Sequence, residues 1–195
     1  MAEEKKLGRV KLKNVRLSFP HLFKPQAGQP DDNGNPGKAR YNASFINEAN
    51  NQFAAENERA VLKAIEDVKK AKWGDKIPKI KAEKLCWRDG DEESYDGYEG
   101  NWYLSSASPG DKKAPLLRDR RRNQVKEEDG LLYGGCYVNA IVTIWAQDDA
   151  NYGKRINAVL EGVQFVAHGE AFGNAGISDD DFDEYDDDDD DDMFD

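Results

Sequence analysis

The fold is decided by the stretch GCYVNAIVTIWA, residues 135–146, in which two kinds of side chain alternate along the chain. One parity carries only small or branched apolar side chains: Cys136, Val138, Ala140, Val142 and Ile144. The other parity is mixed: Tyr137, Asn139, Ile141, Thr143 and Trp145. Such alternation is typical of a half-buried β-strand. We therefore expect the first face to line a core and the second face to reach the surface.

A second strong strand is predicted over residues 155–167. Its apolar positions run from Ile156 to Phe165, and their parity shifts at Gly162. Glycine inside a strand often marks a bend at the corner of a small barrel. The pattern therefore indicates a curved sheet.

The first half of the chain predicts two more strands and a helix. Residues 9–19 alternate basic and apolar side chains, and a change of parity between Leu12 and Val15 indicates a bulge near Asn14 or a switch of the buried face. Residues 20–37 are rich in proline and glycine and predict a loop. Residues 38–46 alternate again, and Asn47 is placed to cap a helix over about residues 48–72.

The remaining segments are short strands and long basic loops. Residues 84–88 and 100–106 predict strands, whereas residues 109–129 predict a polar connection. Five or six strands with one long helix favour a mainly β fold, an OB-fold-like five-stranded antiparallel barrel, over a sandwich. We expect a flexible N-terminus over residues 1–8, the barrel domain over 9–173 and a disordered acidic tail over 174–195.

The net charge of −11 hides two parts of opposite sign. Of the 39 acidic residues, 13 follow Ile177, where no lysine or arginine occurs. Residues 1–177 therefore hold 28 basic against 26 acidic side chains, a net charge of about +2. A weakly cationic body with an anionic tail is compatible with a nucleic-acid partner, although the overall charge alone argues against one.

The tail is the most specific feature of the sequence. Seven consecutive aspartates precede Met193, Phe194 and Asp195, and they are Asp186, Asp187, Asp188, Asp189, Asp190, Asp191 and Asp192. Self-repulsion and the shortage of apolar residues favour disorder. Three roles stay open: a solubilising segment, a partner-binding segment anchored by Phe194, and a mimic of phosphate that occupies the DNA groove of the same chain.

Catalysis, metal binding and membrane insertion find little support. His21 and His168 are far apart, and neither lies near cysteines or carboxylates at metal-ligand spacing. No phosphate-binding loop, nucleophile elbow or dinucleotide fingerprint occurs. No apolar run spans a membrane, and the amino terminus lacks a signal core. We expect a cytoplasmic, non-enzymatic protein without metal or cofactor, with Cys86 and Cys136 buried and reduced.

A single-stranded DNA-binding surface explains the distribution of aromatic and basic residues better. Such proteins neutralise phosphates with cations and stack unpaired bases on flat side chains. We expect the bases to stack on Tyr98, Tyr103, Tyr137 and Trp145; Tyr103 shares its predicted outer face with Asn101 and Ser105, whereas Trp102 has the parity of the core. We expect the phosphates to contact Lys38, Arg40, Arg88, Lys112, Lys113, Arg118, Arg120, Arg121 and Arg122.

The chain resembles the single-stranded DNA-binding proteins of bacteriophages, in which an OB-fold body carries an acidic tail that ends near an aromatic residue. The resemblance rests on residues 14–20, 135–140 and 162–166 and on the tail, where Phe194 matches the family's terminal aromatic residue. It implies largely sequence-independent binding of single-stranded DNA during phage replication and recombination in the infected host. It also implies that the tail contacts replication proteins such as a polymerase or helicase.

Other functions remain as alternatives at this point. The protein could be an acidic chaperone or DNA mimic whose active part is the tail. It could also be an annealing or recombination factor that uses the same groove, and duplex DNA stays open as a second partner. The order of elements differs from the usual OB-fold, because the predicted helix follows the second strand rather than the third.

Overall fold

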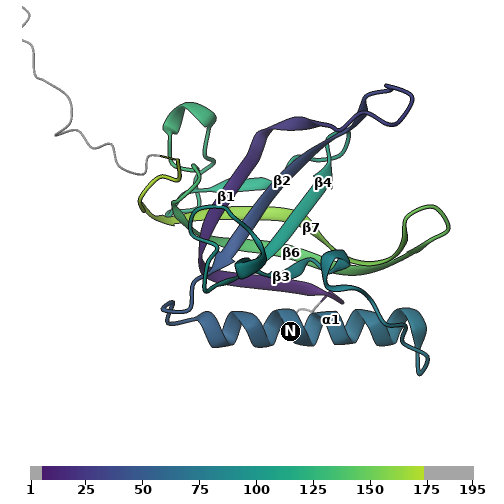
Figure 1. Cartoon of the computed structure of the whole chain (residues 1–195). Coiled ribbons are helices and arrows are strands. Elements are labelled where there is room, and N and C mark those ends of the chain that lie inside the picture. Colours follow the sequence, from purple (N-terminus) through teal and green to yellow (C-terminus); the bar gives the residue numbers. More distant parts are fainter. Residues whose placement is uncertain (1–5, 174–195) are drawn as a thin grey trace, which may run out of the picture.

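Five strands close into a barrel in the computed structural model, which describes residues 6–173 (Figure 1). They are β1 (Arg9–Gly28), β2 (Gly37–Asn47), β4 (Trp102–Pro109), β6 (Tyr137–Asp149) and β7 (Gly153–Ala167). Neighbours in the order β4-β2-β1-β6-β7 pair antiparallel, and a parallel bridge between Ala107 and Val159 closes the ring. The mainly β, OB-like barrel is therefore confirmed, with a parallel contact at its seam.

Two short strands pair with strands of the barrel, and short helices lie in its loops. β3 (Trp87–Asp89) pairs antiparallel with β4, and β5 (Leu116–Arg118) pairs parallel with β7. Three single-turn 3-10 helices are η1 (Ala82–Lys84), η2 (Gly90–Glu92) and η3 (Glu127–Asp129). Helix α1 (Ala54–Trp73) lies across one end of the barrel and follows the second strand, as the sequence order indicates (Figure 1). No helix within residues 6–173 is long and apolar enough to cross a membrane.

The core consists of the apolar parity of the barrel strands. Val138, Ala140 and Val142 of β6 have no solvent exposure, as the alternation in residues 135–146 predicts. Helix α1 covers the end of this core with Val61, Ala64, Ile65 and Val68. Burial of so many branched side chains supplies most of the driving force for folding.

Two bulges bend the sheet where the parity of the sequence changes. Leu12 pairs with Ala140 and Val15 with Val138, so β1 holds one residue more than β6 between these pairs. A second bulge in β7 lies beside Gly162, where the register against β6 shifts again. Bulges increase local twist, which helps a sheet to close on itself. Both changes of parity are thus explained by extra residues.

The bulge in β1 is held by asparagine side chains. Asn14 adopts a φ of 51°, a left-handed conformation that asparagine tolerates better than most residues. The bulge leaves backbone groups of Lys13 and Asn14 outside the ladder. Buried Asn57 accepts from the Lys13 N–H and donates to the Lys13 carbonyl, both at 2.9 Å. Asn139 accepts from the Asn14 N–H at 3.0 Å.

Some predicted boundaries are wrong. The segment predicted as a loop over residues 20–37 is β-strand as far as Gly28, with irregular pairing to β2 that accommodates Pro20 and Pro25. The helix begins at Ala54 rather than near Glu48. Asn47 does not cap it by accepting backbone N–H bonds, because its side chain donates to the Ala54 carbonyl and accepts from Asn57.

Replacing Asn57 with alanine should destabilise the protein. The Asn57→Ala change leaves the Lys13 N–H and the side-chain oxygen of buried Asn47 without their partner, whereas the Lys13 carbonyl keeps the bond from Asn51. An unsatisfied buried polar group costs about 1–3 kcal/mol, so we expect the free energy of unfolding in urea to fall by roughly 2–4 kcal/mol. Asn33→Ala, in an exposed turn, is the matched control; an equally small change for both variants would contradict this role of Asn57.

Candidate nucleic-acid interface

A basic groove of about 620 Å³ runs along the outside of the barrel. One wall is the segment from the end of β4 through β5, the other is the start of β1, and the outer faces of β6 and β7 lie between them. Six cationic side chains line it: Arg9, Lys11, Lys112, Lys113, Arg118 and Arg122. A smaller pocket beside Tyr137, by comparison, has no lysine or arginine in its lining.

A single carboxylate faces these cations. Glu161 lies 3.5 Å from the Lys6 Nζ atom and 3.6 Å from Arg9 Nη2, so its charge is largely compensated within the protein. The four cations of the opposite wall, Lys112, Lys113, Arg118 and Arg122, form no ion pair with residues 6–173. They are therefore available to an external anion.

The floor of the groove is apolar. It includes Leu116 of β5, which is 48% exposed, and Ile141 of β6, with Val159 and Val163 of β7 beside them. An apolar strip between cations, exposed chiefly at Leu116, can contact the flat faces or sugars of an unpaired strand. A surface that served only to solubilise the protein would not combine these features.

Two aromatic side chains of β6 lie outside the lining of the groove, on either side of its β6 residues Asn139 and Ile141. Tyr137 and Trp145 occupy the outer parity of β6 on either side of Ile141, as the sequence predicts. Eight residues of extended strand separate them by about 27 Å. Trp145 is 42% exposed, and Tyr137 is half-buried with the Arg16 guanidinium 5.8 Å from its ring centre. The outer parity of β6 therefore carries an aromatic ring on each side of the residues that line the groove.

Buried hydroxyl groups occur at the same surface. Ser108, at the wall of the groove, and Thr143, between Ile141 and Trp145 on β6, are at most 8% exposed. Their hydroxyl oxygens have no hydrogen-bond partner within residues 6–173. Buried polar atoms without partners are rare in folded proteins and often mark a site for a ligand or water.

The other predicted phosphate contacts lie at varying distances from this groove. Arg40 pairs with Pro109 at its rim, and Lys38 is exposed two residues earlier in β2. Arg120 and Arg121 are exposed in the turn beside Arg122 but do not line the groove. Arg88 is elsewhere, on β3, where its Nε donates to the Leu85 carbonyl at 2.8 Å. The structure thus gathers four of the nine predicted cations in the groove itself.

Tyr98 and Tyr103 do not face outward as predicted. They are 2% and 4% exposed and pack together with Ile46 and Phe172 in a second small core. The Tyr98 hydroxyl donates to Ser18 at 3.0 Å and the Tyr103 hydroxyl to Glu93 at 2.6 Å. The alternation of β4 does not reveal this burial, because the loop after β3 folds back over this face of the strand.

The surroundings of the two tyrosines are also anionic. The loop over them carries six carboxylates: Asp89, Asp91, Glu92, Glu93, Asp96 and Glu99. Negative charge of this density repels a phosphate backbone. By contrast Trp102, which has the parity predicted for the core, is 43% exposed and stacks on Trp87 with ring centres 6.0 Å apart.

Two cations of the groove, Arg9 and Lys11, are not among the residues predicted for the site. Their alternation with Val10 and Leu12 in the first strand is the signal that places both side chains outward. The sequence around Leu116 has no alternation that would predict a strand or an exposed apolar side chain at this position. A three-residue parallel strand has too short a pattern to be distinguished from the loop around it.

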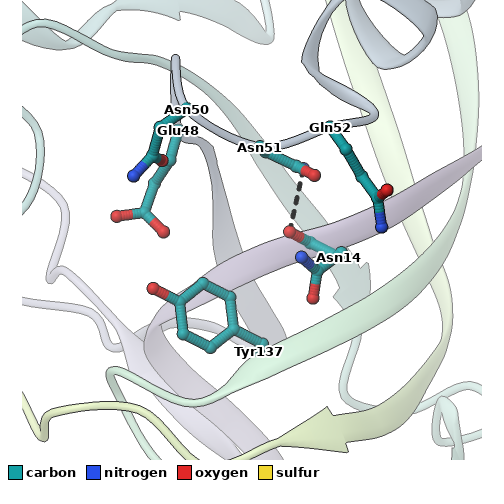
Figure 2. A pocket seen from close by; sticks show the side chains of 6 residues that line it. All are labelled: Asn14, Glu48, Asn50, Asn51, Gln52 and Tyr137. Carbon is teal, nitrogen blue, oxygen red and sulfur yellow. Dashed lines mark hydrogen bonds between the residues drawn. The ribbon is translucent and has the colours of Figure 1, made fainter.

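A smaller pocket of about 350 Å³ opens beside Tyr137, where the bulge of β1 meets the turn before α1 (Figure 2). Its lining is polar rather than basic, and it is considered separately below. Within residues 6–173 no group of three His, Cys, Asp or Glu side chains is arranged to hold a metal ion. Cys86 and Cys136 are buried and unpaired, and burial raises the pKa of their thiols to about 12 and about 11.

Comparison with known proteins gives consistent matches. The family model described as the single-stranded DNA-binding protein of Enterobacter phage Enc34 matches residues 8–194. A protein of Acyrthosiphon pisum secondary endosymbiont phage 1, described as putative protein p50, is 39% identical over 186 residues, 90% of this chain and 93% of the relative.

Solved structures resemble the barrel as well. The single-stranded DNA-binding protein of bacteriophage Enc34, solved in complex with single-stranded DNA, superposes with a TM-score of 0.71 at 29% identity. This match covers 86% of this chain and 91% of the phage protein. The single-stranded DNA-binding protein gp2.5 of bacteriophage T7 has a TM-score of 0.54 at 12% identity, covering 89% and 91% of the two chains, which shows a shared fold.

The buried position of Tyr103 predicts a loss of stability at alkaline pH. Burial, followed by the hydrogen bond to Glu93, raises the pKa of Tyr103 from 10.0 to about 12. The unfolded chain then releases this proton near pH 10 while the folded chain retains it, so the free energy of unfolding falls between about pH 10 and 12. Urea unfolding across this range should show a smaller fall for Tyr103→Phe than for the wild type.

Tyr152→Phe serves as the control, because Tyr152 is 69% exposed. It should reproduce the pH dependence of the wild type. If Tyr103→Phe also reproduces it, Tyr103 is not held in the buried setting described here.

Proposed function

The chain belongs to the family of the Enterobacter phage Enc34 single-stranded DNA-binding protein, and from this membership we propose that it binds single-stranded DNA, largely independently of sequence, in the basic groove. The observation that carries the proposal is the pairing of six cations with an apolar floor along β6 and β7. Cations neutralise phosphates whatever the base, and an apolar floor accepts any base or sugar.

The arrangement of the groove suits an unpaired strand better than a duplex. Lys112, Lys113, Arg118 and Arg122 stand on one wall, while Ile141 and Val159 lie on the floor below them. A strand whose phosphates follow the cations would turn its bases toward this floor and toward the rings of Tyr137 and Trp145. In a duplex the faces of the bases are stacked and cannot reach such a surface.

The hydroxyl of Ser108, which has no hydrogen-bond partner within residues 6–173, also supports binding of DNA in the groove. It lies in the wall of the groove beside Pro109, close to the start of the basic segment. Serine hydroxyls are frequent donors to phosphate oxygens and sugars in nucleic-acid complexes. A bound strand would give this buried group the partner that the protein does not supply.

We also propose a biological role for this binding. The protein would coat single-stranded DNA during phage replication and recombination in the cytoplasm of the infected host, as non-catalytic binding proteins do. The acidic tail, with its aspartates at 186–192 and Phe194, lies outside the described residues; we propose that it recruits replication proteins such as a polymerase or helicase. Its charge is also suited to compete with DNA for the four free cations.

Neutralising two cations of the groove should weaken binding and make it less sensitive to salt. Each phosphate contact on a single strand contributes about −0.7 to the slope of log K against log salt. The double variant Lys112→Gln/Lys113→Gln should therefore lose up to about 1.4 from this slope and roughly tenfold or more in affinity at about 0.1 M salt. Titration with oligothymidine, followed by fluorescence anisotropy of labelled DNA, measures both quantities.

The matched control is Lys70→Gln/Lys72→Gln, which removes the same charge from exposed positions near the end of α1. It should bind as the wild type apart from a small general effect of net charge. An equal loss for the two double variants would mean that binding is not localised to the groove, and absence of binding by the wild type would refute the function itself.

A further inference from the structure

The small pocket beside Tyr137 has a composition unlike that of the groove. Four amide side chains, one carboxylate and one phenol surround about 350 Å³ (Figure 2). The lining consists of Asn14, Glu48, Asn50, Asn51, Gln52 and Tyr137. Amides both donate and accept hydrogen bonds, so the pocket offers many polar contacts in a small volume.

Part of this lining is held rigidly. Asn51 donates to the carbonyls of Lys13 and Asn14 at 3.0 and 2.9 Å, and its own oxygen accepts from the Phe53 N–H. Asn14 is held in its left-handed conformation by these bonds and by Asn139. Backbone strain maintained by surrounding contacts is frequent at binding sites.

Two other side chains are free to meet a ligand. Asn50 and Gln52 are exposed, and within residues 6–173 their amides form no hydrogen bond. In Figure 2 the amide of Gln52 and the carboxylate of Glu48 flank the space above the Tyr137 ring. The pocket thus combines a fixed aromatic wall with polar groups that have unused bonding capacity.

The pocket continues the groove at one end. Asn139 lines the groove, accepts from the Asn14 N–H and donates to Gln164, another groove residue, at 3.3 Å. Tyr137 is the next outward residue of β6, about 7 Å along the strand from Asn139. A DNA strand that occupies the groove therefore reaches the mouth of the pocket without changing direction.

The charges of the pocket exclude a phosphate group. Its carboxylate, Glu48, is 3.7 Å from Arg16 Nη1. The Arg16 guanidinium also donates to the carbonyls of Gly135 and Glu170 at 3.1 and 2.6 Å, so these contacts occupy it and it is not available to a phosphate. Burial, assisted by the Glu48 carboxylate, also raises the pKa of the Tyr137 phenol, which stays protonated at neutral pH. An uncharged planar group with hydrogen-bonding edges meets these conditions better.

We propose that this pocket accepts one unpaired nucleobase of the strand bound in the groove, with Tyr137 against its face and Glu48 accepting from its exocyclic amino group. This rests on the proposed function and adds a base preference to it. Carboxylates accept hydrogen bonds from the N4 amino group of cytosine. Thymine has the same size but presents a carbonyl oxygen there, which a carboxylate repels. The pocket therefore favours cytosine over thymine.

The test compares oligocytidine and oligothymidine of equal length, at neutral to slightly alkaline pH, for the full chain and its variants. Intrinsic tryptophan fluorescence reports binding of each oligonucleotide. The readout is the ratio of the two affinities, because this ratio cancels effects on phosphate contacts. Glu48→Gln should shift the ratio toward thymine at least fivefold relative to the wild type, since an amide can also donate to the thymine carbonyl.

Two further variants make the result unambiguous. Glu56→Gln removes an exposed carboxylate of α1 that pairs with Lys13 outside the pocket, and it should keep the ratio of the wild type. The double variant Asn50→Ala/Gln52→Ala alters only exposed side chains, so it should fold even if Glu48→Gln does not, and its ratio should also shift toward thymine.

A ratio that is unchanged in both pocket variants overturns the base pocket while the proposed function stands. A shift of the same size in Glu56→Gln overturns it too, because the effect would then come from general charge. If the wild type binds neither oligonucleotide, the proposed function fails together with the pocket.

Discussion

The bulge of β1 at Asn14 is the constraint on which the rest of the structure depends. One extra residue turns the strand, so that its first part, up to Arg16, pairs with β6 and the remainder, from Arg16 to Gly28, pairs with β2. The backbone groups that this turn leaves outside the ladder are taken by Asn57 of α1, by Asn51 and by Asn139 of β6. The same contacts that permit closure of the barrel therefore fix the helix and shape the polar pocket.

This geometry also separates the charges of the molecule. Before the bulge, Arg9 and Lys11 point outward beside Ile141 and contribute to the basic groove. The loop after β3, by contrast, concentrates carboxylates over Tyr98 and Tyr103. A polyanion approaching the protein is thus attracted to one surface and repelled from another, which favours a defined path for the strand.

The sequence predicted those parts of the fold that depend on regular alternation. The faces of β6, the bulges near Asn14 and Gly162, and the OB-like barrel follow from side-chain parity, and Tyr137 and Trp145 were placed correctly on the outer face. Parity failed for Tyr103, because the loop between β3 and β4 covers its face of β4, whereas Trp102 on the other face is 43% exposed. The groove could not be assembled from the sequence, since its wall depends on β5 crossing to β7 from a segment without periodicity.

The central claim is that a single strand of DNA lies along the groove between β5 and the outer face of β6. Amide hydrogen exchange of the full chain, with and without saturating oligothymidine, tests it most directly. We predict slower exchange in residues 109–122 and at the outer ends of β6 when DNA is bound. Slower exchange confined to the acidic loop 89–99 or to α1, with residues 109–122 unchanged, would contradict the account.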